Sequence, residues 1–435
     1  MKIDPEILAS QLQSELGTEA VTLDAEVLRK FSVDGQTPGI VCFPLTPDQV
    51  GAALRLCNEA EAAVTPWGGG TAMALGNMPR GVDAVLALDR LDKLVEHDDA
   101  NLTATVQAGM RLSVLQEQLK QRNQFLAIDP PRPDRATIGG IVAANINGPR
   151  RMLYGSVRDL VIGMKMVLAT GEQIKAGGKV VKNVAGYDLC KLFVGSLGTL
   201  GIITEVTFKM APLPETAGTV IAQGPLADCI KMVEEVSSST LLPAAITLFN
   251  NAAAQAQGFE TQTAAIGVWT EGFTEAVERH LTNTQSIAAR TDLVCEILRD
   301  NAHRGFWKKV CEFGTGRETI LYRLTVPLAS LEPVLMALEQ WSPSNQTIQM
   351  IAHVGTGTIL VHTNADSEAI KWFPKLSAMA KDHRGHVVVI AAPPALKKDL
   401  NVWGPVPPSV NIMREIKSQF DPNGILNPGR FISGI

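Results

Sequence analysis

Glycine residues gather in two parts of this chain where bare backbone N–H groups could bind an anion. The first is the triplet Gly68–Gly70, and the second is the stretch from Asp129 to Glu205. The glycines of the second stretch stand singly or in pairs: Gly139, Gly140, Gly148, Gly155, Gly195, Gly198 and Gly201. Glycine permits positive φ and a close approach of the backbone to another group. Its repeated use predicts backbone amides wrapped around a large ligand that carries phosphate.

The triplet directly follows a predicted strand at residues 63–65 and continues as P-W-G-G-G-T-A-M-A-L-G. Upstream, residues 40–43 form another predicted strand, and Thr46 is the expected N-cap of a helix that begins at Pro47. The order strand, helix, strand, glycine loop is typical of a nucleotide site at the carboxyl end of a strand. The triplet lacks the G-x-G-x-x-G spacing that opens a helix. A loop, rather than a helix N-terminus, is therefore expected to hold the phosphates.

The elements that must position these loops are predicted from hydrophobic periodicity. An amphipathic helix is expected over 5–17, with Ile7, Leu8, Leu12 and Leu16 on one side. Further strands are expected near 85–88, 93–97, 102–107, 161–169, 172–175 and 202–208, and helices near 111–122, 138–146 and 188–194. Asp188 is the expected N-cap of the last helix. These segments predict an α+β region.

The composition of the chain changes after Pro212 and Pro214, because glycine clusters become rare there. Predicted strands lie at 219–223, 244–249, 265–270, 319–326, 348–353, 358–363 and 386–391, and predicted helices at 226–238, 273–289, 329–340 and 367–381. Their order predicts two ferredoxin-like halves that share an antiparallel sheet. Residues 291–318 are expected to be a long connection. A helix at 409–420 precedes a turn-rich tail at 420–431.

Composition limits the class of protein. With 435 residues and 46% apolar side chains, the chain is long enough for two or three domains with full cores. A net charge of −5 without a basic block argues against nucleic-acid binding. The six cysteines form no C-x-x-C pair, which excludes an iron–sulfur cluster ligated by this chain alone and favours reduced cytoplasmic thiols. Without a signal peptide or a long apolar span, membrane contact is expected only peripherally, through partners.

Several motifs in a fixed order resemble the vanillyl-alcohol-oxidase (PCMH-type) family of FAD-binding proteins. They are P-W-G-G-G-T, A-T-I-G-G-I-V-A-A-N-I-N-G, Y-G-S-V-R-D-L-V, G-S-L-G-T-L-G-I-I-T-E-V and D-P-N-G-I-L-N-P-G-R-F. Within this family, the compact length and the run V-K-N-V-A-G-Y-D-L-C-K-L are similar to the FAD-binding E subunits of bacterial glycolate oxidase/dehydrogenase. The resemblance covers residues 35–215 and 415–431 well, and the middle of the chain in outline.

The resemblance implies an α+β fold, with a two-part FAD-binding domain and a C-terminal cap domain of antiparallel sheet with helices. The expected parts are an N-terminal helical segment at 1–34, the FAD-binding domain at 35–215, the cap or substrate domain at 216–408, and a segment at 409–435 that packs back on the FAD domain. FAD is expected to be non-covalent, because Thr71 and Ala72 stand where relatives with attached flavin carry a histidine.

The same resemblance implies which residues contact FAD. The pyrophosphate would lie against Gly68, Gly69, Gly70 and Thr71, assisted by Thr137, Gly139 and Gly140. The ribityl and adenine side would be lined by Asn145, Gly148, Gly155, Gly201 and Ile203. Trp67, Pro130 and Gly198 complete the expected set, and Trp67 suits ordinary packing as well as stacking on the flavin.

One motif departs from the catalytic pattern. Catalytic members of the 2-hydroxy-acid branch carry H-x-G-D-G-N-x-H and a later E-H pair, which together bind a metal and the substrate. Here H-V-G-T-G-T-I-L-V-H-T at 353–363 keeps His353 but has Thr356, Thr358 and Leu360 at the other positions. His362 lies two positions further on, on the same face of a strand as Leu360. The E-H counterpart, G-H-V-V-V-I, lacks the acid, so no metal site is predicted.

Flavin oxidation of a hydroxy acid needs a base for the hydroxyl proton and a cation for the carboxylate. His353 and His362 are the candidate bases, and Arg317 and Arg323 are the candidate cations. Each has a plainer interpretation as well. The histidines suit paired polar residues on a strand, and the arginines suit solvated or interface charges.

The favoured hypothesis is an FAD subunit of a glycolate (2-hydroxy acid) dehydrogenase complex, which oxidises glycolate to glyoxylate or relays its electrons. The resemblance implies two partners, a second FAD subunit with the full metal–histidine set and an iron–sulfur subunit. Three alternatives stay open: a self-sufficient dehydrogenase for another hydroxy acid such as D-lactate, a non-catalytic flavin relay or structural subunit, and a binding module that has lost flavin.

Overall fold

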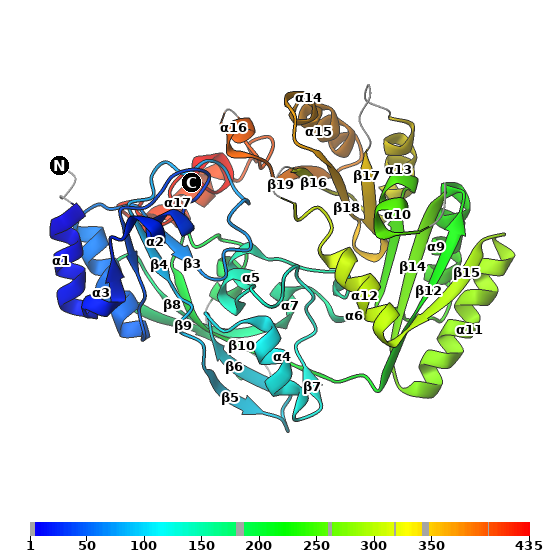
Figure 1. The fold of residues 1–435 in the computed structure, drawn as a ribbon, viewed down its shortest axis with the longest axis horizontal. Coiled ribbons are helices and arrows are strands. Elements are labelled where there is room, and N and C mark those ends of the chain that lie inside the picture. Colours follow the sequence, from blue (N-terminus) through cyan, green and yellow to red (C-terminus); the bar gives the residue numbers. More distant parts are fainter. Residues whose placement is uncertain (1–4, 180–186, 260–262, 317–318, 342–347, 399) are drawn as a thin grey trace.

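The computed structural model describes residues 5–435 apart from 180–186, 260–262, 317–318, 342–347 and 399. Arg317 and part of the V-K-N-V-A-G-Y-D-L-C-K-L run therefore lie outside the described residues. Two lobes are visible in Figure 1: a first lobe that contains both ends of the chain, and a second lobe built around one large sheet. Among the described segments, no helix combines the length and apolar character that a membrane crossing requires.

The first lobe contains a four-stranded sheet in the order β1-β2-β4-β3. Its strands are β1 (Val21–Thr22), β2 (Ile40–Cys42), β4 (Ala84–Ala87) and β3 (Val64–Trp67), with helices α1 (Pro5–Leu16), α2 (Ala25–Lys30) and α3 (Pro47–Glu59) around them. Strand β4 pairs in parallel with both β2 and β3. Thr46 caps α3 by accepting a hydrogen bond from the Gln49 amide at 3.2 Å, as predicted. The placement of Ile7 on the buried side of α1 was wrong, because its side chain is 55% exposed.

A five-stranded antiparallel sheet forms the other part of this lobe, in the order β5-β6-β10-β8-β9. Its strands are β5 (Leu94–Asp98), β6 (Thr103–Gln107), β10 (Ile202–Lys209), β8 (Val161–Val167) and β9 (Gln173–Gly177). The helices of this part are α4 (Leu112–Lys120), α5 (Ile138–Ala144), α6 (Arg151–Tyr154), α7 (Val157–Leu160) and α8 (Leu189–Phe193). Both predicted hairpins, β5–β6 and β8–β9, are confirmed. A short pair, β7 (Gln124–Phe125) and β11 (Ala211–Pro212), lies at the exit of the lobe.

The second lobe is an eight-stranded antiparallel sheet in the order β15-β12-β14-β13-β17-β18-β16-β19. Its strands are β12 (Thr216–Gly224), β13 (Ala245–Phe249), β14 (Ala264–Gly272), β15 (Val294–Arg299), β16 (Thr319–Thr325), β17 (Gln349–His353), β18 (Thr358–Asn364) and β19 (His386–Ala391). Each half follows the β-α-β-β-α-β order, and the two halves join where β13 pairs with β17. The prediction of two ferredoxin-like halves in one sheet is confirmed in this topology.

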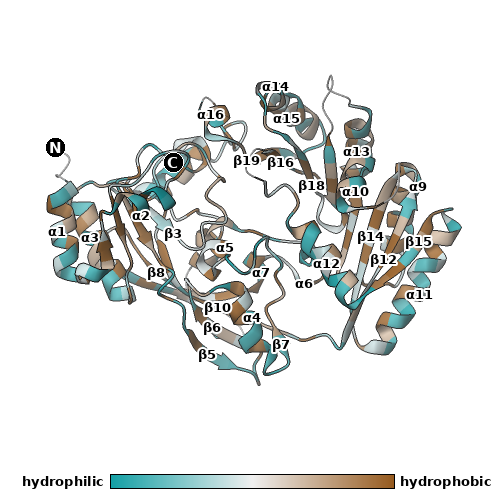
Figure 2. Ribbon diagram, in the orientation of Figure 1, coloured by the Kyte–Doolittle hydropathy of each residue, from teal (hydrophilic) through white to brown (hydrophobic). Residues whose placement is uncertain are grey.

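Helices cover both faces of this sheet. Their bounds are α9 (Leu226–Ser238), α11 (Thr274–Arg290), α13 (Leu331–Gln340), α14 (Ser367–Ile370) and α15 (Trp372–Asp382) with the larger core, and α10 (Asn251–Gln257) and α12 (Asp300–Cys311) with the smaller one. Figure 2 shows that hydrophobic residues concentrate on the strands and hydrophilic ones on outer helices such as α11. The predicted connection at 291–318 was wrong, because it contains β15 and α12. The half-exposed pattern of β15, at the edge of the sheet, left no clear hydrophobic run.

The chain then returns to the first lobe through α16 (Pro394–Lys397) and α17 (Val410–Phe420). The tail beyond α17 lies against β3, where the Val64 amide donates to the Ile425 carbonyl at 2.8 Å and the Asn427 amide donates to the Val64 carbonyl at 2.8 Å. Two distant parts of the chain thus lie side by side at the start of β3, the strand that leads into the glycine triplet. The domain boundaries expected at 35–215 and 216–408 stay predictions.

Candidate functional site

The glycine triplet forms the turn that leaves β3. A Cβ atom at Gly68 would overlap the Thr137 hydroxyl, and one at Gly69 would overlap the Arg135 carbonyl oxygen. The loop therefore lies directly on the segment that leads into α5, at a distance that only glycine allows. This contact holds the exposed backbone of residues 68–70 beside the first turn of α5.

A cavity of about 760 Å³, here called cavity one, lies against this loop. Most of the predicted cofactor residues line it, namely Trp67, Gly68, Gly69, Gly70, Thr71, Thr137, Gly139, Gly140, Gly198, Gly201 and Ile203. They come from the end of β3, the start of α5 and the turn before β10. The structure brings together three motifs that are spread along the chain between Trp67 and Ile203.

The remaining predicted cofactor residues lie elsewhere. Asn145 is the left-handed C-cap of α5, and Gly155 has φ +85 at the end of α6. Gly148 and Pro130 line two other cavities. Their contact with a cofactor stays a prediction.

The surroundings of the Thr137 hydroxyl indicate which kind of ligand cavity one could bind. Its hydroxyl is buried and has no hydrogen-bond partner among the described residues. A buried hydroxyl without a partner is unfavourable, so a ligand with acceptor oxygens would stabilise this site. Together with the glycine backbone and the small residues of α5, Thr137 fits a dinucleotide with a diphosphate. Trp67 packs edge to face on Phe31, with ring centroids 5.1 Å apart, and so also has the packing role.

Two further residues line cavity one, Asn427 and Arg430, and neither is in the predicted cofactor set. The Asn427 side-chain amide donates to the Leu197 carbonyl at 2.7 Å, and Arg430 is only 2% exposed. Both belong to the N-P-G-R part of the tail. A charged residue in this otherwise turn-forming motif was the feature of the sequence that could have indicated a contact with the cavity.

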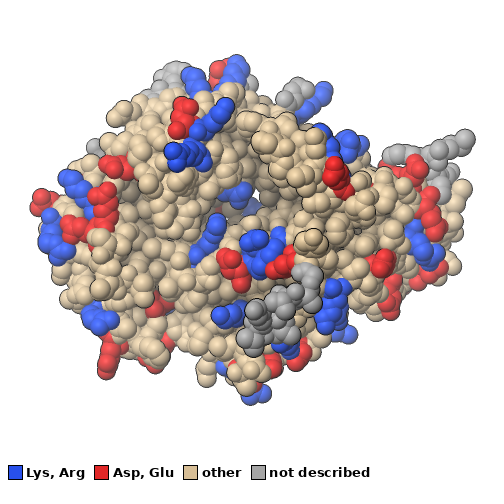
Figure 3. Space-filling model, turned by 180° about the vertical axis from the view of Figure 1, so that it is seen from behind, with Lys and Arg blue, Asp and Glu red and all other residues tan. Residues whose placement is uncertain are grey.

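A second cavity of about 1100 Å³, cavity two, lies between the lobes and shares Thr71, Ala72, Leu75 and Ala144 with cavity one. The two cavities are therefore adjacent. The β-sheet side of cavity two is lined by Leu321, Arg323, His353, Thr358, Leu360, Ile390 and Ala391. Figure 3 shows a hollow between the lobes with Lys and Arg side chains around it and Asp and Glu side chains close to them. The charged residues that line cavity two are Asp129, Arg132 and Arg323, so an anion could find positive partners there.

His353 stands at the end of β17 and lines cavity two. Its Nδ1 lies 3.0 Å from the Thr247 hydroxyl on β13, which holds the ring in place. Burial lowers the pKa of His353 to about 4, because the charged form loses its hydration. The ring is therefore neutral near pH 7 and able to accept a proton.

His362 is not among the residues that line cavity two. Its Nδ1 lies 3.3 Å from the Gln349 side-chain oxygen, and its ring packs edge to face on Phe313. Burial lowers the pKa of His362 below its ordinary value. These contacts fit the simpler interpretation, in which His362 is a strand residue whose ring is hydrogen-bonded and packed by its neighbours. The catalytic role of His362 stays a prediction.

Arg323 lies on β16 directly opposite Leu360 of β18. It lines cavity two and makes no hydrogen bond or ion pair with any described residue. Burial, followed by repulsion from Arg151, lowers its pKa, although a guanidinium keeps its charge at any ordinary pH. A half-buried cation on the wall of a cavity, with no partner among the described residues, attracts a small carboxylate.

Within the described residues, no three His, Cys, Asp or Glu side chains are grouped so that they could hold a metal ion. At the altered motif, the Thr356 hydroxyl donates to the His353 carbonyl at 3.1 Å and lies 3.2 Å from the Thr358 hydroxyl. The two threonines thus bond locally, at positions where the resemblance described above implies metal-site residues in catalytic members.

A buried ionic group also joins the lobes beside cavity two. Asp129 accepts a hydrogen bond from the Arg150 amide at 3.0 Å, and the Arg150 guanidinium pairs with Glu271 at 2.9 Å. Arg150 also lies over the ring of Trp269, 4.3 Å from its centroid. Burial is the main cause that raises the pKa of Asp129 to about 6. Sequence reasoning missed this group, because its members are far apart in the chain.

Comparison with known proteins shows that the chain is similar to FAD-dependent enzymes. Residues 38–177 match the family model of the FAD binding domain, and residues 396–431 match the C-terminal domain of FAD linked oxidases. The chain is 30% identical to glycolate oxidase subunit GlcD of Bacillus subtilis, over 91% of this chain and 89% of that protein. It is 26% identical to D-lactate dehydrogenase of Anaerostipes hadrus, over 99% and 98% of the two chains.

The fold is similar to solved structures of lower identity. Alkyldihydroxyacetonephosphate synthase superposes with a TM-score of 0.78 at 18% identity, over 98% of this chain and 85% of that one. p-Cresol methylhydroxylase superposes with a TM-score of 0.74 at 16% identity, over 98% and 96% of the two chains. Both similarities concern the fold.

Proposed function

Because this chain belongs to the family of FAD-dependent oxidoreductases that act on 2-hydroxy acids, we propose that it is an FAD subunit of a glycolate-type dehydrogenase complex. The proposed reaction is the oxidation of glycolate to glyoxylate. The observation that carries it is the pair of Arg323 and His353 on the wall of cavity two, which adjoins cavity one.

In this proposal, FAD bound in cavity one supplies the two-electron acceptor. Arg323 binds the substrate carboxylate through charge-assisted hydrogen bonds, which fixes the hydroxy acid in cavity two. His353, neutral near pH 7 and oriented by Thr247, accepts the hydroxyl proton. The apolar wall formed by Leu360, Ile390 and Ala391 limits water around this pair.

Arg323 also supports carboxylate recognition without a metal. It stands in register with Leu360, the position that the second metal-binding histidine takes in relatives with the full motif. A guanidinium presents several donors in a fixed plane and matches a carboxylate well. The proposed site therefore uses a half-buried arginine where those relatives use a metal ion.

The proposed partners are a second FAD subunit with the full metal–histidine set and an iron–sulfur subunit. Two features support them: the relative from Bacillus subtilis is itself described as a subunit, and the six cysteines here are scattered. The proposed location is the cytoplasm, with peripheral membrane contact through these partners.

A second candidate function is a flavin relay that does not oxidise substrate itself. The replacement of the metal-site positions by Thr356, Thr358 and Leu360 favours it. A self-sufficient dehydrogenase for another hydroxy acid, such as D-lactate, is the third candidate, because a D-lactate dehydrogenase is among the relatives.

The purified chain, loaded with FAD and kept without oxygen, separates these candidates. Glycolate and D-lactate are added in turn, and the visible absorbance of the oxidised flavin is followed. Bleaching by glycolate supports the proposed activity, and bleaching by D-lactate alone supports the third candidate. A yellow protein that bleaches only with partner subunits present is the relay, and a protein bleached by neither acid with its partners contradicts all three.

A further inference from the structure

A third cavity of about 900 Å³, here called cavity three, lies beside cavity two where the lobes meet. Its wall combines α4 and the segment 128–133 of the first lobe with β14 and α12 of the second. Arg304 and Lys308 line it and are exposed, so the cavity reaches the surface. Asp129 and Cys311 line both cavity two and cavity three and therefore lie between them.

The carboxyl group of Asp129 is hydrogen-bonded through one oxygen only. Its Oδ2 accepts a hydrogen bond from the Arg150 amide at 3.0 Å, while its Oδ1 is buried and has no hydrogen-bond partner among the described residues. A Cβ atom at position 148 would lie 2.2 Å from this Oδ1, so only glycine leaves room beside it. One oxygen thus fixes the carboxyl group, and the other can carry a proton.

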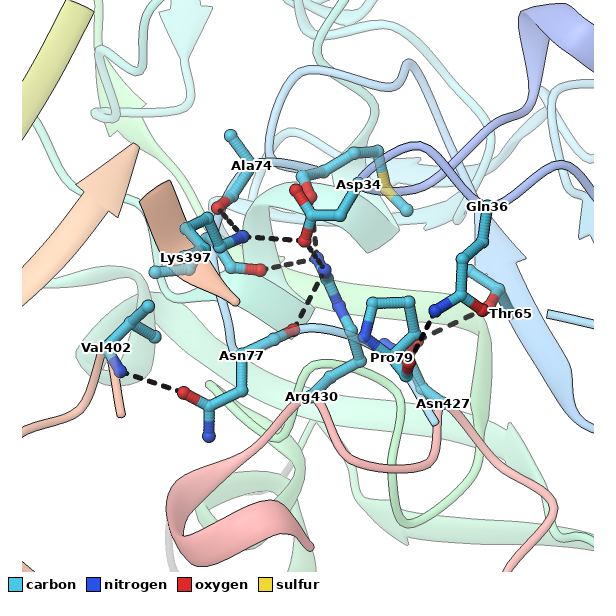
Figure 4. Close-up of polar contacts among 12 residues, drawn as sticks. Asp34, Gln36, Thr65, Ala74, Asn77, Pro79, Lys397, Val402, Asn427 and Arg430 are labelled. Carbon is cyan, nitrogen blue, oxygen red and sulfur yellow. Dashed lines mark hydrogen bonds and ion pairs between the residues drawn. The ribbon is translucent and has the colours of Figure 1, made fainter. Parts of the chain in front are cut away.

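Asp34, another buried carboxylate, has different surroundings (Figure 4). The Lys397 ammonium and the Arg430 guanidinium both lie 2.6 Å from its Oδ2, so two cations pair with one carboxylate. Beside Asp129, by contrast, the guanidinium of Arg150 is paired with a second carboxylate, Glu271, at 2.9 Å. One cation between two buried carboxylates favours a proton on one of them.

The groups that surround Asp129 agree with this. Burial is the main cause that raises its pKa to about 6, while the charge of Arg150 opposes the shift and that of Glu271 adds to it. Burial also raises the pKa of the Cys311 thiol well above its ordinary value, so the thiol keeps its proton. Of the two residues between the cavities, only Asp129 can therefore accept a proton. The other charged or titratable residues that line the two cavities are Arg132, Arg323, His353, His303, Arg304, Lys308 and Glu312.

The proposed oxidation releases one proton into cavity two. The hydrogen on carbon leaves with the two electrons that the flavin accepts, and the hydroxyl proton goes to His353, which must lose it before the next turnover. The pKa of His353 is about 4 and that of Asp129 is about 6, so the carboxylate binds the proton more tightly than the ring does. Near pH 7, a group with this pKa then gives the proton up to water.

We propose that Asp129 is a proton-relay residue that takes the hydroxyl proton out of cavity two and releases it to the water of cavity three. The proton crosses cavity two from the His353 imidazolium to the Asp129 carboxylate, which becomes a carboxylic acid, and then passes to water. No electrons move in these steps. The proposal rests on the proposed function, because it needs a proton that is released in cavity two.

The test uses the FAD-loaded, full-length chain and Asp129→Asn, which keeps an acceptor for the Arg150 amide but cannot take up a proton near neutral pH. Turnover is measured with the hydroxy acid that bleaches the parent flavin and a soluble dye as electron acceptor. Because the relay acts after the substrate is oxidised, Asp129→Asn should lower kcat roughly tenfold or more and leave kcat/KM nearly unchanged. Imidazole in solution, a small diffusible base, should restore part of the lost kcat. Asp228→Asn, which removes a carboxylate that lines none of the three cavities, is the control and should keep both parameters.

The pH dependence is a second readout. Asp129 accepts a proton only while it is ionised, so kcat of the parent should fall as the pH drops through about 6, where kcat/KM is still level. Glu271→Gln removes a charge that raises the pKa of Asp129, so it should move this decline in kcat to lower pH. Infrared spectra of the FAD-loaded parent, recorded on both sides of this pH without substrate, should show a carboxylic-acid band that Asp129→Asn lacks.

Unchanged kcat in Asp129→Asn, or an equal loss of kcat and kcat/KM that imidazole does not relieve, would overturn the proposal and leave the proposed function standing. If no hydroxy acid bleaches the parent flavin, even with partner subunits, the proposed function fails and the relay with it. Should Asp129→Asn not fold, the pH profiles of the parent and Glu271→Gln proteins decide, and identical profiles would count against Asp129.

Discussion

Cavity one is formed largely by backbone, whereas cavity two is formed by side chains on strands. The first depends on glycines that touch other backbone, as Gly69 does at Arg135, so few substitutions leave its shape intact. The second depends on which side chains the strands present, as Arg323 and Leu360 do, and can change while the sheet stays the same. A cofactor site of the first kind keeps its sequence motifs, and a substrate site of the second kind can be rebuilt.

The largest effect is expected for Gly69→Ala. The added Cβ would overlap the Arg135 carbonyl and push the loop from α5, so we expect FAD affinity to fall roughly 100-fold or more, with loss of all flavin-dependent activity. Titration of the flavin-free protein with FAD measures it. Gly81→Ala is the control, because its Cβ would meet only the Ala63 methyl group at 3.4 Å. Equal affinity of both variants would show that cavity one is not a rigid backbone site.

His353→Gln should reduce kcat roughly 100-fold or more, since it removes the proposed base and leaves the cavity in place. In the parent chain, kcat/KM should stay level as the pH falls below about 6.5, and drop only as it approaches about 4. His362→Gln, outside the cavity wall, is the control and should keep both the rate and the profile. A profile that falls near an ordinary histidine pKa would argue against His353 as the base.

The same histidine should affect stability. Because the pKa of His353 is lowered by folding, protons bind the unfolded chain more tightly. The free energy of unfolding therefore decreases as the pH drops from about 6.5 to about 4, because the ring gains a proton in the unfolded chain before it does so in the folded one. Unfolding temperatures of the parent and His353→Gln proteins across this range should show a shallower decline for the variant. Parallel curves would contradict the buried state of this ring.

Arg323→Met should lower kcat/KM for the hydroxy acid roughly 100-fold, mainly through KM, with the flavin spectrum unchanged. Arg323→Lys should recover only part of the loss, because an ammonium lacks the planar fork. Arg299→Met removes an exposed arginine of the same lobe, paired with Glu278 at 2.5 Å, and should have little effect. Retained kcat/KM in Arg323→Met would remove the carboxylate role from this residue.

The smallest effect is expected from a metal chelator. If Arg323 takes the place of the metal, treatment of the FAD-loaded chain with EDTA should leave the rate of flavin bleaching by substrate unchanged. A relative with the full metal–histidine set, treated in parallel, should lose activity. A loss in this chain that added zinc restores would mean that cavity two binds a metal after all.

Continuous segments were the most predictable part of the molecule. Thr46, the hairpins and the two ferredoxin-like halves follow from local capping, alternation and order. The strand β15 was missed because Glu296 interrupts its apolar residues, so V-C-E-I-L-R shows neither a continuous apolar run nor strict alternation. The glycine motifs predicted most of the wall of cavity one for the same local reason, since each motif carries its own backbone shape.

Contacts between distant segments could not be predicted in this way. Asp34, Lys397 and Arg430 are ordinary charged residues in the sequence, and only the return of the tail to β3 buries them together. Likewise, strand pairing alone brings Arg323 opposite Leu360 and leaves His362 outside the wall of cavity two. Local backbone preferences depend on residues that are neighbours in the sequence, so the sequence by itself determined the family, the cofactor and the glycine loops. Burial and charge pairing depend on residues that meet only after folding, so the tertiary structure alone decided which side chains line cavity two and which charged side chains are buried together.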